Sequence, residues 1–255
     1  MTSIDERPWT RVVQEAGPEV RVVTYKYHSR KLARDRAARR RKEDVKQATR
    51  DCWCRKTKTD KIELYLACIG WHAKHYVLTY EAIQDPAKYG EVQKDFDRFR
   101  RAVKRRRGDV FAYLYAVEGL HGEAEWHVHI VVDSRELTYD DLMACWCGGG
   151  VREAQPQISK RKGGFRGLAK YLTKEPKDGK RKPLDIRGWG VARVVKDRLP
   201  PPVRSQADSP VYDVPDGSTQ VYRSPPVVNE FGEYRYVTYL RPRRKGHARA
   251  HATLT

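Results

Sequence analysis

Apolar runs at strand-like spacing mark four β-strands between residues 75 and 159. The first is "HYVLTYE" at His75–Glu81, followed by Asp109–Gly119 and by "EWHVHIVVD" at Glu125–Asp133. A short polar link separates the second run from the third, which predicts an antiparallel hairpin. Val151–Ser159 predicts a fourth strand, and Pro156 suggests that this strand lies at an edge or carries a bulge.

Helical periodicity appears three times between or after these strands. In Gly90–Gly108, four apolar residues form one stripe and Lys and Arg fill the other positions: Val92, Phe96, Phe99 and Val103. Thr138 is a suitable N-cap for a second helix, in which two Asp residues occupy the first turn. The segment Phe165–Glu175 predicts a third helix, which ends before Pro176.

The order strand, helix, strand, strand, helix, strand, helix predicts an α+β fold with an RRM-like or ferredoxin-like antiparallel sheet. We expect the helices on one face of this sheet and the functional site on the other. The expected organisation is a basic N-terminal extension at 1–60, a central domain at 61–200, and a linker, hairpin and basic tail at 201–255. A strand near Arg187–Val195 and a hairpin turning near Phe231 and Gly232 complete the expected elements.

The charge of the chain points to a polyanionic partner. The 255 residues carry a formal net charge of +19, and Arg21–Lys58 alone holds 15 Lys or Arg against 4 Asp or Glu. Nucleic acid is the simplest explanation of this excess, and we expect Arg39, Arg40, Arg41 and Lys162 to contact DNA. The sequence shows no signal-peptide pattern and no membrane-spanning run, so we expect a cytoplasmic protein with no membrane partner.

The five cysteines are too few and too unevenly placed for a disulfide framework. Two pairs have the spacing "CWC", at Cys52 and Cys54 and at Cys145 and Cys147. This spacing is tighter than that of common zinc sites, and the pairs are compatible with free thiols or with zinc binding.

The third strand carries the clearest candidate chemistry, because His127 and His129 are separated by one residue. Side chains alternate along a strand, so both imidazoles project from one face. If the hairpin closes tightly, Glu118 lies opposite His127 on that face and completes a group of three metal ligands. A hydrogen-bonded histidine pair and a surface carboxylate remain the alternative, and the other candidate ligands are His121, Glu123 and Glu125.

The predicted third helix adds Tyr171 and Lys174, which are three residues apart. This spacing puts both on neighbouring positions beside the apolar stripe of Phe165, Ala169 and Leu172. A phenol with an ammonium group beside it suits a nucleophile with a charge-stabilising partner. An ordinary tyrosine at the core edge and a solvated lysine are the alternative.

The order "YVLTY", Glu118, "HVH" and "YLTK" resembles that of HUH-type single-tyrosine rolling-circle replication initiators, the Rep endonucleases. The resemblance covers roughly Tyr76 to Lys174. It implies that Glu118 and the two histidines bind Mn²⁺ or Mg²⁺, that Tyr171 is the nucleophile and that Lys174 neutralises phosphate charge. It also implies contacts to single-stranded DNA from the first motif, which departs most from the family pattern: Leu78, Thr79 and Tyr80.

The function implied by this resemblance is nicking and joining of single-stranded origin DNA through a 5′-phosphotyrosine intermediate, which starts rolling-circle replication of a plasmid or phage. No GxxxxGK[ST] loop occurs in the sequence, so a host helicase and polymerase are expected partners. An HUH transposase or relaxase is a related alternative. A non-catalytic RRM-like nucleic-acid-binding module is another, with three aromatics as a stacking platform, although alternation puts them on the face opposite Glu118: Phe111, Tyr113 and Tyr115.

Overall fold

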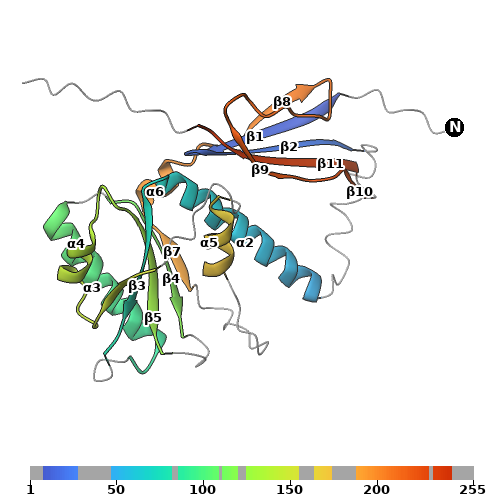
Figure 1. Cartoon of the computed structure of the whole chain (residues 1–255). Helices are drawn as coiled ribbons and strands as arrows, with labels where there is room; N and C mark the ends of the chain where they lie inside the picture. The colour runs from blue at the N-terminus through green and yellow to red at the C-terminus, as the bar shows by residue number, and fades with distance from the viewer. Residues whose placement is uncertain are drawn as a thin grey trace, which may run out of the picture.

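Two antiparallel sheets and a small set of helices make up the described part of the chain, which confirms the predicted α+β class (Figure 1). The computed structural model describes residues 8–27, 47–81, 86–108, 111–119, 125–154, 164–173, 188–229 and 232–242, with side chains for all of these except 47–57. Across these residues, no helix is both long enough and apolar enough to cross a membrane.

The predicted central sheet has five strands in the order β6-β3-β5-β4-β7, and every neighbouring pair is antiparallel. Its strands are β3 (Ala73–Thr79), β4 (Tyr113–Glu118), β5 (His127–Asp133), β6 (Val151–Glu153) and β7 (Trp189–Val191). The first four strands and the two helices between them have the ferredoxin-like order that the sequence predicts. The short strand β7 adds one edge beside β4.

Helices α3 (Tyr89–Arg107) and α4 (Tyr139–Cys145) cover one face of this sheet. The predicted stripe of α3 is confirmed, because its buried residues are Val92, Phe96, Phe99 and Val103. Thr138 caps α4 as expected and forms a capping box with Asp141. The apolar spacing of both helices therefore determines which face of the sheet they cover.

The opposite face is not fully open, which corrects the expectation that all helices lie on one side. Helices α2 (Gln47–Ile69) and α5 (Arg166–Leu172) pack against it, and Tyr65 of α2 lies 6.5 Å from Trp189 of β7, measured between ring centroids. The physical reason is the apolar second half of α2, where Ile62, Leu66 and Ile69 are buried. The expected basic extension therefore ends in a helix that belongs to the core.

A second, six-stranded sheet combines both ends of the chain in the order β10-β11-β2-β1-β8, with β9 paired to β11. Its strands are β1 (Trp9–Ala16), β2 (Glu19–Tyr27), β8 (Val203–Ala207), β9 (Thr219–Arg223), β10 (Val227–Asn229) and β11 (Gly232–Leu240), and the short helix α6 (Arg193–Asp197) precedes β8. The expected hairpin at β10 and β11 is confirmed. The expected boundaries at 60 and 200 do not separate these segments, since residues 9–27 pair with residues after 200.

The turn between β1 and β2 explains how the second sheet meets the first unit. Gly17 has a φ of +52°, and a Cβ at this position would lie 2.1 Å from the carbonyl oxygen of Ala67 in α2. Only glycine combines this backbone conformation with so close an approach. The hairpin therefore packs its turn directly against the end of α2.

Candidate metal centre and nucleophile

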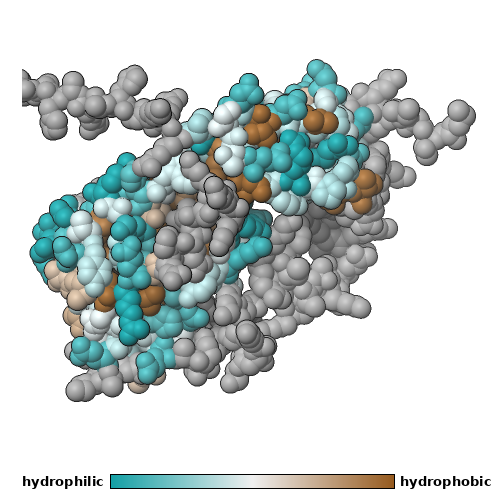
Figure 2. Space-filling model, in the orientation of Figure 1, coloured by the Kyte–Doolittle hydropathy of each residue, from teal (hydrophilic) through white to brown (hydrophobic). Residues whose placement is uncertain are grey.

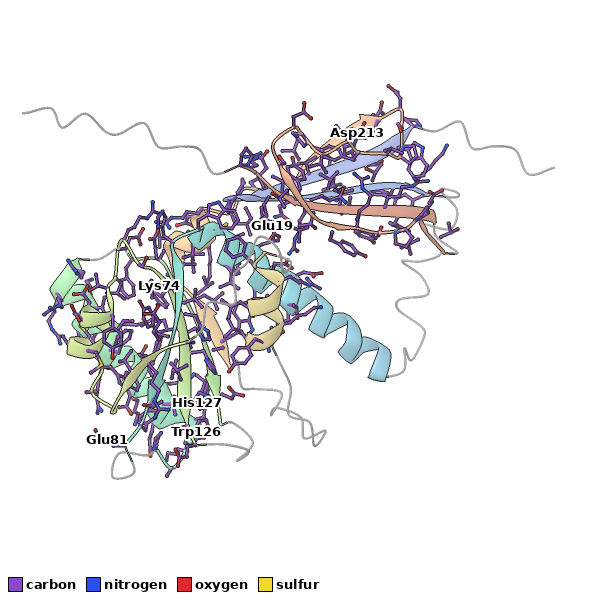
Figure 3. The ribbon with its side chains drawn as sticks, in the orientation of Figure 1. Glu19, Lys74, Glu81, Trp126, His127 and Asp213 are labelled. Carbon is purple, nitrogen blue, oxygen red and sulfur yellow. The ribbon has the colours of Figure 1, made fainter. Side chains whose placement is uncertain are left out.

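The hairpin of β4 and β5 brings Glu118 directly opposite His127, as the sequence predicts. His129 lies two residues further along the same face. Glu118 Oε2 is 3.0 Å from His127 Nε2 and 2.7 Å from His129 Nε2. The candidate ligand atoms of all three residues lie within 4.8 Å of one another, so one ion could contact all of them. Figure 3 places His127 at the end of the five-stranded sheet that is far from the six-stranded sheet.

The local electrostatics keep this group ready to bind a cation. Hydrogen bonds from His127 and then from His129 hold the pKa of Glu118 far below its usual range, so the carboxylate is ionised at neutral pH. The ring of His127 is oriented by its second nitrogen, because Nδ1 lies 2.8 Å from the carbonyl oxygen of Glu125. When that Nδ1–H donates to the carbonyl, Nε2 is left with a lone pair for a metal.

These donors fit a divalent ion. Two imidazole nitrogens and one carboxylate oxygen on one strand pair leave room for water or phosphate oxygens around the ion, as catalytic sites require. Among the described residues, this trio is the one group of His, Cys, Asp and Glu with the spacing of metal ligands. Cys145 is buried and Cys147 is exposed, and neither belongs to this group, while the side chains of Cys52 and Cys54 lie outside the described residues.

A third histidine, His75 of β3, supports the group and was not found from the sequence. Its Nε2 lies 3.0 Å from His129 Nδ1, on the side of the His129 ring that faces away from Glu118. His75 is 4% exposed, and burial together with the neighbouring His129 lowers its pKa to about 3. A neutral His75 therefore holds the second nitrogen of His129 and fixes the orientation of that ring.

Tyr171 of α5 lies over the same histidines. Its ring centroid is 5.3 Å from that of His129 at an interplanar angle of 85°, and 5.9 Å from that of His75. The side chain is 39% exposed, so the phenol is open to solvent and to a substrate. Partial burial and the charge of Glu118 raise the pKa of Tyr171 above its usual value. The predicted nucleophile therefore lies beside the predicted metal ligands, while Lys174 lies outside the described residues.

Contacts at both ends hold α5 on α2 and thereby position Tyr171. At the start of α5, Arg166 forms ion pairs with Asp60 and with Glu63, the latter at 2.7 Å. Just beyond its last residue, Thr173 Oγ1 lies 2.9 Å from Thr59 Oγ1 in a buried hydrogen bond. The predicted docking stripe is confirmed, since three of its members are buried: Phe165, Ala169 and Leu172.

The expected DNA contacts at the end of β3 are corrected in part. Leu78 is fully buried on the face covered by α3 and α4, so its side chain offers no surface to DNA. Thr79 is half-buried on the face of the metal ligands, and its hydroxyl donates a hydrogen bond to the Gly150 carbonyl at 3.1 Å. Tyr80 is half-buried against Trp146, with ring centroids 5.3 Å apart. Four predicted contact residues lie outside the described residues: Arg39, Arg40, Arg41 and Lys162.

Comparison with known proteins adds one match. Residues 73–176 match a family model described as "Replication-associated protein ORF2". Searches of curated proteins and of solved structures gave no match. The matched segment begins at β3 and extends past α5, so it contains the metal-ligand group, His75 and Tyr171. Over this segment the chain is similar to proteins with a role in the initiation of replication.

Proposed function

We propose that this protein is a metal-dependent endonuclease that nicks and rejoins single-stranded DNA at a replication origin, with Tyr171 as the nucleophile. The observation that carries the proposal is the position of the Tyr171 ring over His129, beside the group formed by Glu118, His127 and His129. The similarity to replication-associated proteins gives the biological setting. The net charge of +19 supports a nucleic-acid substrate.

The proposed reaction is a transesterification at phosphorus. The Tyr171 oxygen attacks the scissile phosphate, the bond from phosphorus to the 3′-oxygen breaks, and a 5′-phosphotyrosine forms. The phenol proton passes to solvent, to which Tyr171 is accessible, and the leaving 3′-oxygen takes up a proton. A Mn²⁺ or Mg²⁺ ion held by Glu118, His127 and His129 would polarise the phosphate oxygens. The reverse reaction rejoins the ends, so the same site can close the product strand.

The raised pKa of Tyr171 explains why a cation partner is needed. A phenol that titrates above its usual value is almost fully protonated at neutral pH, so attack requires positive charge near its oxygen. Lys174 is the proposed neighbour for this role, three residues beyond Tyr171. The free 3′-hydroxyl would serve as primer for a host polymerase, and a host helicase would separate the strands.

One specific observation disfavours the non-catalytic alternative. An RRM-like module would stack bases on aromatic residues of its central strands. Here Tyr113 and Tyr115 lie on the face covered by α3, where Phe96 packs against Tyr115 at 4.2 Å between ring centroids. These rings are part of the core under a helix and are not available as a platform. The parity argument from the sequence is thereby confirmed.

A covalent-trapping experiment tests the proposal. The purified full chain is incubated with a library of labelled single-stranded oligonucleotides and Mn²⁺, then denatured and searched for protein with a covalently attached nucleotide. Mass spectrometry should place the nucleotide on the peptide that contains Tyr171. Attachment to another exposed tyrosine such as Tyr139, which is 40% exposed, would assign the chemistry elsewhere. Cleavage without any covalent adduct would refute the tyrosine mechanism.

A further inference from the structure

Five tyrosines gather on one face of the six-stranded sheet. Tyr234 is paired with Tyr25 across β11 and β2, Tyr27 and Tyr236 are two residues from these on the same strands, and Tyr222 of β9 is paired with Thr238 of β11. Strand alternation therefore directs all five side chains to one side. The ring centroids are 5.0 Å apart for Tyr25 and Tyr27, 6.0 Å for Tyr25 and Tyr234, and 6.3 Å for Tyr27 and Tyr234.

This tyrosine face is not the core of its sheet. The small core lies on the opposite side, where Val20, Val22, Val237 and Tyr239 are buried together. At the Arg21 end of β2, the same face as the tyrosines packs on α2, because Arg21 donates to the Asp60 carbonyl at 3.1 Å. The tyrosines lie further along the strands, at the end of the sheet that carries β10 (Figure 1).

Exposure distinguishes the tyrosine face from ordinary packing. Tyr27 is 38% exposed and Tyr222 is 53% exposed. Figure 2 shows a surface that is mainly hydrophilic in this view, with separate brown residues on the six-stranded sheet and no continuous apolar face. Rings with an apolar plane and a polar hydroxyl at a wet surface suit a partner that is itself planar and polar.

The charges around the tyrosine face favour an anionic partner. From Arg21 towards the tyrosines, the described strand positions on this face include Arg204 of β8 and no Asp or Glu. The chain also leaves β2 at Tyr27 directly into residues 28–46, which hold nine Lys or Arg and three Asp or Glu. A partner that combines negative charge with flat rings is single-stranded nucleic acid, whose bases stack on aromatic side chains while cations contact its phosphates.

We propose that the tyrosine face binds single-stranded DNA by stacking its bases on Tyr27, Tyr234 and their neighbours, as a second DNA contact separate from the metal centre. The choice of DNA as the nucleic acid rests on the proposed function. Stacking accepts any base, so this face adds affinity without reading the sequence. It would hold DNA that flanks the cleaved site while Tyr171 acts on the scissile phosphate.

Binding measurements on the full chain test this inference. Fluorescence anisotropy with a labelled single-stranded oligonucleotide in EDTA reports binding without cleavage. Tyr27→Ala and Tyr234→Ala should each raise the Kd roughly fivefold or more, because each removes one stacked ring. Tyr27→Phe retains the ring and should bind like the wild type. Tyr139→Ala, at an exposed tyrosine on α4, is the matched control and should leave the Kd unchanged.

A photocrosslink gives a second readout that does not depend on the stability of the variants. An oligonucleotide with 5-iododeoxyuridine should crosslink to peptides of β2 or β11. Crosslinks only elsewhere, or an unchanged Kd for Tyr27→Ala with an unchanged Tm, would overturn the inference, as a protein partner for this face would predict. Adduct formation at saturating DNA is scored separately. Its loss in a protein that still crosslinks through β2 would count against the proposed function alone.

Discussion

The phenol ring of Tyr171 stands edge-on over the imidazole of His129, with ring centroids 5.3 Å apart and planes at 85°. The two residues come from different elements, α5 and β5, and 42 residues separate them in the sequence. His129 also contacts Glu118 through Nε2 and His75 through Nδ1. Nucleophile, candidate metal ligand and orienting group therefore meet at one imidazole, and each can be removed by a single substitution.

Removal of the Tyr171 hydroxyl should separate chemistry from folding. Tyr171→Phe keeps the ring that packs beside His129 and removes only the attacking oxygen, so the Tm should change little while the covalent DNA adduct disappears. Lys174→Ala should slow adduct formation roughly 10- to 1000-fold without abolishing it, as for the loss of one charge-stabilising group. Gel-based single-turnover assays measure both rates. A Tyr171→Phe protein that still forms adduct would rule out this nucleophile.

Loss of a metal ligand should abolish cleavage and spare DNA binding. Glu118→Gln, His127→Ala or added EDTA should each reduce nicking below detection, whereas single-stranded DNA affinity should stay within a factor of about two, because binding comes mainly from contacts to phosphate. Glu125→Gln is the matched control, since Glu125 contacts His127 only through its backbone carbonyl. Equal nicking with and without EDTA would contradict the metal assignment.

His75 should affect metal affinity through His129. His75→Ala removes the hydrogen bond that orients the His129 ring and should weaken Mn²⁺ binding about 10- to 100-fold. His75→Gln restores a polar atom near the position of Nε2 and should recover most of the affinity. Electron paramagnetic resonance of free Mn²⁺ measures binding without DNA, and thermal unfolding excludes a general loss of structure. Wild-type affinity in a folded His75→Ala protein would show that His129 needs no such support.

The basic segment after β2 should contribute a salt-dependent part of DNA binding. Replacing Arg39, Arg40 and Arg41 by Gln removes up to three phosphate contacts and should flatten the slope of log Kd against log salt by about 2 for single strands. Substitutions on the tyrosine face should instead weaken binding by the same factor at every salt concentration. An unchanged slope in the Arg variant would mean that these residues serve another partner.

The metal-ligand group was predictable because its geometry is local. A period of two along β5 and a short link to β4 determine that Glu118 faces His127 and that His129 shares their face. The α5 stripe fixed the docked side of the helix in the same way. His75 was missed because its contact with His129 depends on the register of β3 against β5, which pairs residues more than 50 positions apart.

The second sheet was missed for a related reason. Strand β8 has four exposed residues out of five and reads as a linker, since its pairing with β1 joins segments about 200 residues apart. The clearest local signal was β1, Gly17, Pro18 and β2, two β-branched runs around a turn, but the positive charge of the following segment obscured it. The core half of α2 was hidden likewise, behind the charged first half of the same helix.

Glu19 should make stability depend on pH at the junction of the two sheets, where Figure 3 labels it. Its side chain is fully buried beside Arg21 and near Glu63, and burial is the main cause that raises its pKa from 4.5 to about 7. The folded state therefore favours the protonated form. The resulting stabilisation is complete below about pH 4.5 and is lost as the pH rises through about 7.

The amide of Glu19→Gln mimics the protonated acid at every pH, so the wild type should lose about 1 to 3 kcal/mol relative to this variant between pH 5 and pH 8. Urea unfolding at intervals of one pH unit measures the difference. Glu233→Gln, at a partly exposed carboxylate paired with Arg235 on the same sheet, controls for the loss of one charge. A difference that stays constant with pH would mean that Arg21 keeps Glu19 ionised throughout, because only a carboxylate that gains its proton on folding makes the two curves diverge.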